Sequence, residues 1–206
     1  WLHEPDLALH LTGSQLAVRQ KPLMNAKVNP DLTLKVKPYW LGVTGKVEVP
    51  QALFQPQALS DKAIPLSPDV QIIQLGEQQA RAHLAKTMQK WAIDADVDLL
   101  LGDQVQFQGF GLSSLLTGGL RLQQHAQQGM QANGEIELNV KADKGKEPKY
   151  EAYGQTLNIR KGQILFAGSV SQPALNIEAI KTIDTKVVGV RVEGRANAPT
   201  VQLFSD

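Results

Sequence analysis

The sequence predicts an all-β protein whose sheet has one apolar and one polar face. Three observations lead to this prediction: apolar and polar residues alternate over most of the chain, short turn sequences separate the alternating runs, and only one segment has helical spacing. Alternation with a period of two residues is typical of a strand that buries one of its faces. Short turns favour antiparallel neighbours, because parallel neighbours need long connections. We therefore expect an elongated, mostly antiparallel sheet.

The first part of the chain contains the shorter alternating runs. They cover residues 7–11, 16–18, 32–36, 41–43 and 47–49. Turn signals at Gly13, Asn29-Pro30 and Gly45 separate these runs, and Pro38 and Pro50 stop two of them, since proline cannot donate to a strand ladder. The residues that follow are rich in Pro, Gln and Ala up to residue 68, which indicates an irregular connection before a short strand at 69–74.

Residues 76–91 depart from the alternation. Ala80, Leu84, Met88 and Trp91 recur at helical spacing, with Gln, Lys and Arg between them. We expect a short helix or a mobile insert that caps an edge or an end of the sheet, because short helices depend on tertiary packing. A helix that binds a specific partner is the alternative interpretation.

Alternation dominates again from residue 92 to the end. The runs cover residues 95–101, 105–107, 120–122, 136–140, 157–159, 175–179, 188–192 and 201–203. Asn133-Gly134, Lys161-Gly162 and the charged residues 143–146 predict hairpin turns. No Pro-rich or Gly/Ser-rich linker divides the chain, so we expect one domain over residues 1–206. The chain starts without Met and ends directly after an alternating run, and we expect it to be a fragment of a longer protein.

Composition and motifs argue against several classes of function. Lys and Arg number 21 against 20 Asp and Glu, a balance that argues against nucleic acid as the main partner. The absence of cysteine excludes disulfides and thiol catalysis. No run approaches the roughly 20 apolar residues of a membrane helix. The few aromatic residues disfavour an outer-membrane barrel, which would need aromatic girdles.

No constellation in the sequence suits catalysis or a cofactor. Asp94, Asp96 and Asp98 have the spacing of a calcium loop, but Leu99 and Val105 occupy the positions that need Gly and Glu. These carboxylates are better explained as a solvated strand face. The four histidines are dispersed, and neither a nucleophile elbow nor a phosphate-binding loop is present. We expect a protein that is not an enzyme, with no metal and no cofactor.

The apolar face of the sheet is therefore the candidate site. It is either the core of a closed sandwich or barrel, or an open surface that binds apolar chains. The modest volume of its Val, Ile and Leu side chains favours the open surface. The candidate residues are Val97, Leu99, Leu101, Val105, Phe107, Leu120, Leu122, Ile136, Leu138, Val140, Leu157, Ile159, Ile164, Phe166, Leu175, Ile177, Val188, Val190, Val192, Val201 and Leu203.

Several segments carry a resemblance to a known family. Residues 150–168, 172–179 and 189–206 together resemble the C-terminal domain of the TamB family, and residues 45–52 and 67–70 fit the same pattern. Residues 1–44 and the segment 76–91 resemble it less. The resemblance implies a folded-over sheet that forms a trough with an apolar interior. It also implies relationship to the AsmA-like bridge proteins of the envelope of diderm bacteria.

The resemblance further implies a function. The parent protein would be anchored in the inner membrane, with this segment in the periplasm, and would work with the outer-membrane barrel TamA through regions outside this chain. The trough would shield phospholipid acyl chains on their way to the outer membrane, since each CH₂ in water costs about 0.8 kcal/mol. The alternative is a chaperone or scaffold that holds nascent outer-membrane β-strands.

Overall fold

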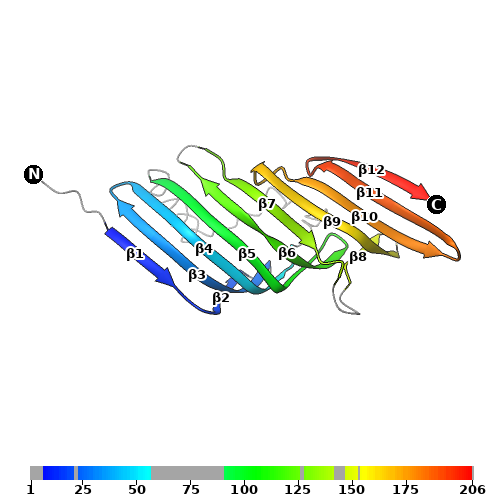
Figure 1. Ribbon diagram of the computed structural model, residues 1–206, viewed down its shortest axis with the longest axis horizontal. Helices are drawn as coiled ribbons and strands as arrows, with labels where there is room; N and C mark the ends of the chain where they lie inside the picture. The colour runs from blue at the N-terminus through cyan, green and yellow to red at the C-terminus, as the bar shows by residue number, and fades with distance from the viewer. Residues whose placement is uncertain are drawn as a thin grey trace, which may run out of the picture.

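The computed structural model describes residues 7–20, 23–56, 91–125, 128–141, 147–152 and 154–205. All strands in these residues belong to one mixed sheet, in the order β1-β3-β4-β5-β6-β7-β9-β10-β11-β12, with β2 and β8 beside this path (Figure 1). The strands are β1 Leu7–Thr12, β2 Leu16–Gln20, β3 Met24–Lys37, β4 Trp40–Phe54, β5 Ala92–Gly109, β6 Leu112–Gln124, β7 Gln131–Leu138, β8 Lys149–Ala152, β9 Gln155–Ser169, β10 Ala174–Ile183, β11 Lys186–Arg195 and β12 Ala198–Ser205. The prediction of an all-β fold is confirmed.

Among the described strands, one pair is parallel and the others are antiparallel. β4 and β5 run in the same direction, in register from Trp40↔Ala92 to Phe54↔Phe107. A parallel pair requires a long crossover, and the chain between Phe54 and Ala92 supplies the length. The prediction of a mostly antiparallel sheet is therefore confirmed, with this one exception.

Two positions in the sheet are each filled by two short strands. β1 and β2 follow one another along the same edge of β3, and β1 pairs with the half that ends at Val36 while β2 pairs with the half that begins at Met24. In the same way β7 occupies the place between β6 and β9 only as far as Leu138, and β8 pairs with both strands beyond it. Splitting a position in this way lets short strands accompany long ones.

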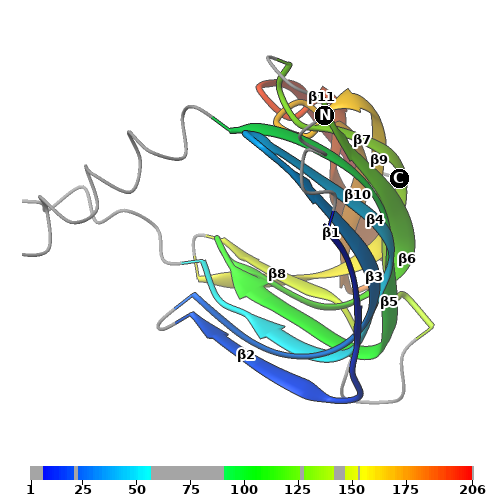
Figure 2. The ribbon, with the colours of Figure 1, turned by 90° about the vertical axis from the view of Figure 1, so that its left-hand side faces the viewer.

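The sheet is strongly curved. Figure 2 shows β3 to β6 as arcs whose two ends lie on the same side of the curve. Register shifts interrupt β3, β4 and β5 between Lys27 and Asn29, between Val49 and Gln51, and between Leu101 and Val105. β-Bulges of this kind bend a strand and increase its twist, so three neighbouring shifts account for a bend shared by adjacent strands.

Glycine and proline break fewer strands than the sequence suggests. Pro30 lies inside β3, and Gly45 and Pro50 lie inside the continuous strand β4. The hairpin predictions at Asn133-Gly134 and Lys161-Gly162 are wrong, because these pairs lie inside β7 and β9. Lys161 faces Glu178 next to a register shift, so the turn-like sequence marks an irregularity within the strand. The turn at 143–146, the strand at 69–74 and the helix or insert at 76–91, except Trp91, fall outside the described residues.

Candidate apolar binding face

The pairing register determines which side chains share a face, because residues directly opposite each other in neighbouring strands point the same way. One such row runs from Val97 through Leu122 to Ala132, across β5, β6 and β7. Another runs from Ile136 through Ile164 to Leu175, across β7, β9 and β10. Rows of this kind join into one apolar face that extends across the sheet.

All but one of the candidate residues lie on this face. They come from β5 (Val97, Leu99, Leu101, Val105, Phe107), β6 (Leu120, Leu122), β7 (Ile136, Leu138), β9 (Leu157, Ile159, Ile164, Phe166), β10 (Leu175, Ile177), β11 (Val188, Val190, Val192) and β12 (Val201, Leu203). Val140 is the exception. β7 ends at Leu138, and Val140 is an exposed turn residue whose N–H donates to the Leu138 carbonyl at 2.8 Å.

The apolar face also includes residues that were not among the candidates. The row Leu9, Leu34, Val43 and Ala95 extends it through β1, β3 and β4 as far as β5. In β2, Leu16 lies opposite Val28 and continues the same face. These side chains carry the same alternation as the candidates, so the sequence signal that identifies them was already present in residues 7–49.

Burial on this face decreases from the middle of the sheet toward its edges. Leu138, Ile159 and Ala179 form the most buried cluster, and the partly buried side chains packed against it include Leu116 and Ile177. Gly162 makes room for this cluster, because a Cβ at Gly162 would lie 2.5 Å from the Leu138 side chain. At the edges, in contrast, the apolar side chains of β1, β2 and β12 are exposed.

The opposite face is polar and is held by ion pairs. Glu178 accepts hydrogen bonds from Arg191, at 2.8 Å from Nη2, and from Arg160. These hydrogen bonds, Arg191 first, lower the pKa of Glu178 against the opposing effect of its burial. On β5 and β6, Arg121 donates two hydrogen bonds of 2.7 Å to Asp96 and lowers the pKa of that carboxyl group. These pairs cross β9, β10 and β11 in one case and β5 and β6 in the other, so they reinforce the register.

The three aspartates singled out in the sequence lie on this polar face. Asp96 pairs with Arg121, and Asp94 accepts a 2.7 Å hydrogen bond from the Trp40 indole. Among the described residues, no group of three metal-ligating side chains is close enough to hold an ion. The arrangement agrees with a solvated strand face on which carboxylates make structural contacts.

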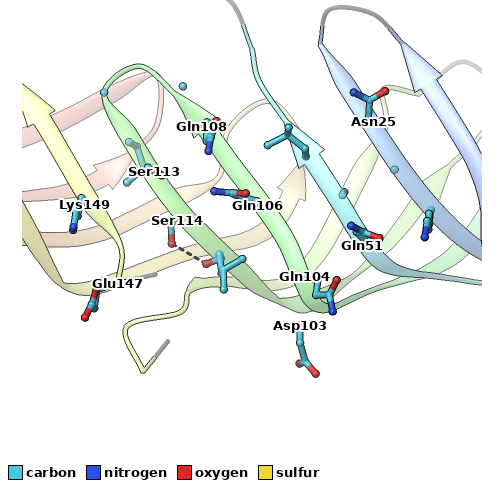
Figure 3. Close-up of a pocket in the computed structure, with 18 of the residues that line it drawn as sticks. Asn25, Gln51, Asp103, Gln104, Gln106, Gln108, Ser113, Ser114, Glu147 and Lys149 are labelled. Atoms are coloured by element: carbon cyan, nitrogen blue, oxygen red, sulfur yellow. Dashed lines mark hydrogen bonds between the residues drawn. The ribbon is translucent and has the colours of Figure 1, made fainter. Parts of the chain in front are cut away.

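A hollow also lies on the polar face. It has a volume of about 1170 Å³, and its lining includes Gln51 from β4 and Gln104, Gln106 and Gln108 from β5. Figure 3 shows these amides on adjacent strands, with Asn25 beside them. Charged side chains of both signs, among them Lys27, Asp103 and Lys149, line the hollow beside the amides, so it suits water or a polar ligand rather than an apolar chain.

The fold and this face define the class of protein: an all-β protein with an extended apolar surface as its candidate site. The described residues form a single curved sheet with a continuous apolar face, and within them no helix has the length and apolar character to span a membrane. The site is an extended surface, not a cluster of reactive groups.

Comparison with known proteins assigns the family. The family model of the TamB C-terminal domain matches residues 1–206, so the chain belongs to the TamB family, as the sequence resemblance indicated. Over 191 residues the chain is 35% identical to the translocation and assembly module subunit TamB of Haemophilus influenzae. The match covers 87% of this chain and 14% of that protein, so the chain spans a small part of its relative.

Proposed function

We propose that this chain is one section of a periplasmic trough that shields phospholipid acyl chains during their transport to the outer membrane. One observation carries the proposal: the apolar face continues without a break from β1 to β12. An acyl chain moving along this face stays in contact with hydrocarbon at every strand. The longer protein would be anchored in the inner membrane and would work in a translocation and assembly module, as the name of the Haemophilus relative suggests.

The burial pattern supports an apolar face on the inside of the curve. The buried hydrophobic residues, all on the apolar face, are Ala52, Val105, Leu120, Ala132, Leu138, Ile159 and Ala179. All twelve strands described belong to one sheet, so within the described part of the chain no second sheet covers these residues. Bending a sheet crowds the side chains on its concave side, and this crowding accounts for burial without a second layer.

The energetics favour a lipid as the occupant. Two long acyl chains in water cost more than about 10 kcal/mol at 0.8 kcal/mol per CH₂. An apolar face removes much of this cost and needs no catalytic group. The charged residues Glu178 and Arg191 lie on the other face. On the apolar face, the charged residues of β10 and β11 are Lys181 and Lys186, at the end of the hairpin that joins these strands.

A second candidate function is to hold nascent outer-membrane β-strands. Among the described strands β12 pairs only with β11, and a client strand would pair along the other edge of β12 by β-augmentation. Val201 and Leu203 on β12 are 60% and 85% exposed, and a paired client could extend the apolar face beyond them. In either case, contact with the barrel TamA would be made through regions outside this chain.

In vivo photocrosslinking tests both candidates. A photoreactive residue at Val190, Val201 or Leu203 should form phospholipid adducts, and the same residue at Gln202 should form few, because Gln202 alternates with its neighbours and lies on the polar face. Mass spectrometry of the adducts identifies the cargo. Outer-membrane protein adducts in place of lipid would support the second function, and equal adducts from both faces would contradict both.

A further inference from the structure

Two aromatic residues occupy turn positions that aromatic residues avoid. Tyr39 and Phe110 have φ angles of 59° and 52°, in the left-handed region that favours Gly and Asn. Pro38 precedes Tyr39 as in a type II turn, whose next position prefers Gly or Asn, and Gly111 follows Phe110 where Asn-Gly is the usual pair. Burial of the rings does not offset this backbone strain, since the two residues are 66% and 67% exposed.

The surroundings of Tyr39 combine apolar rings with polar atoms. Its ring centroid lies 6.5 Å from that of Trp91, and its carbonyl accepts a 2.8 Å hydrogen bond from the Ala92 N–H. Next to it, the Trp40 indole donates to Asp94, and the Lys37 ammonium lies 5.8 Å from the Trp40 ring. Lys37 and Trp40 lie on the polar face, because they alternate with the apolar-face pair Val36 and Leu41. We therefore call only Tyr39 and Trp91 the amphipathic rim. Tyrosine and tryptophan are typical of sites where hydrocarbon meets water.

The other end of β5 has a different composition. Phe110 lies in the turn after β5, and Phe54 and Phe107 pair nearby with ring centroids 5.8 Å apart. These rings have no polar atoms. Both ends of β4 and β5 lie on the same side of the curved sheet in Figure 2, so the two aromatic groups flank the same opening of the curve.

We propose that the amphipathic rim holds the headgroup and glycerol region of a phospholipid whose chains lie on the apolar face. This inference rests on the proposed function and adds the orientation of the lipid. Tyr39 and Trp91 contact the glycerol level through their rings, whose polar atoms face the water side of that level. Contact with lipid then explains why a tyrosine occupies a position of positive φ, because asparagine would adopt this turn conformation with less strain.

Fluorescence quenching of Trp91 tests the orientation. In the 206-residue chain with Trp1→Phe and Trp40→Phe, Trp91 is the single reporter. The protein is mixed with vesicles that contain phosphatidylcholine with a nitroxide either on the choline or at the middle of an acyl chain, and is then separated from the vesicles. We expect the choline label to quench Trp91 at least twice as strongly as the chain label.

A second reporter separates this inference from the proposed function. Val201→Trp, in a chain whose native tryptophans are replaced by Phe, places an indole on the apolar face, where the chain label should quench more strongly. If this reporter is quenched by the chain label while Trp91 is quenched by neither label, or mainly by the chain label, the orientation is wrong and the trough proposal stands. Absence of quenching in both reporters would overturn both.

Substitution of Tyr39 tests its role in a second way. Tyr39→Asn and Tyr39→Ala both remove the ring, but only asparagine tolerates the positive φ. We expect both variants to retain several-fold less phospholipid than the unmodified chain, with the Asn variant melting about 2 °C above the Ala variant. Gln15→Asn, at another residue of positive φ, is the control that should change stability without changing lipid retention. Unchanged retention in both Tyr39 variants would overturn the inference.

Discussion

The middle and the edges of the apolar face have the same chemistry but very different burial. In the middle, Leu138 is 2% exposed and Ile159 is 6% exposed, whereas at the edges Leu9 is 48% exposed and Leu203 is 85% exposed. All four are aliphatic side chains on the same face of one sheet. The difference follows the strand neighbours: the same alternating pattern gives buried side chains where described strands lie on both sides and exposed ones where a described strand lies on one side only.

Neighbouring strands explain the difference. Leu138 has β6 on one side and β9 on the other, and Gly162 leaves the space that its side chain fills. Leu203 has a described neighbour on one side only, at Val190. A substitution in the middle therefore tests the fold, and a substitution at an edge tests binding.

The largest expected effect is that of a charge in the middle. Leu138→Asp should lower the free energy of unfolding by about 3–5 kcal/mol, because it removes a packed side chain and buries an unpaired carboxylate. Urea unfolding followed by circular dichroism measures the loss. Leu138→Met keeps the volume and should cost less than about 1.5 kcal/mol. A loss below 1 kcal/mol for the Asp variant would mean that the middle of the face is open to water.

The sequence predicted the apolar face well because the face that a side chain occupies depends only on whether its position in the strand is odd or even. Ile136, Leu138, Ile164 and Leu175 belong together whatever the order of the strands, since each strand must turn its apolar residues the same way. Val140 does not lie on the apolar face, and the reason is found in a neighbouring strand. β8 takes over the place beside β9, so β7 stops before the alternation does.

Strand length and direction were less accessible from the sequence. Gly45 and Pro50 look like turn residues but lie within β4, where a register shift to β5 between Val49 and Gln51 accommodates them. The parallel pairing of β4 and β5 depends on where the long connection from Phe54 to Ala92 brings the chain back. Local composition contains no information about that position, because it is determined by contacts between distant residues.

The next largest effect on the free energy of unfolding is expected from the ion pairs of Glu178, on the polar face in the middle of the sheet. Glu178→Gln should lower the free energy of unfolding by about 1–2 kcal/mol at pH 7, because the charged partner of two arginines is lost. Glu193→Gln is the matched control: its side chain is 54% exposed and 4.0 Å from the Arg191 Nε, and its loss should stay below about 0.5 kcal/mol. Equal losses in the two variants would show that burial of Glu178 does not strengthen its pairs.

Acid unfolding checks the same contact. Since the pKa of Glu178 is lowered in the folded chain, its contribution is complete above the usual glutamate value of 4.5 and is lost as the pH falls from there through the folded value. The Glu178→Gln variant should therefore lose less stability than the unmodified chain as the pH falls below about 4.5. Parallel acid profiles would mean that Glu178 has the same pKa folded and unfolded.

The smallest effect on stability is expected at the edge, where the effect on binding should be large. Leu203→Asp should change the free energy of unfolding by less than about 0.5 kcal/mol, because the side chain is 85% exposed already. If the edge is a binding surface, the same variant should retain several-fold less phospholipid, measured by mass spectrometry of lipid extracted from the purified chain. Gln202→Asp adds the same charge one residue away on the polar face and should leave retention unchanged. A loss of stability comparable to that of Leu138→Asp would remove the distinction between middle and edge, since the whole apolar face would then be core.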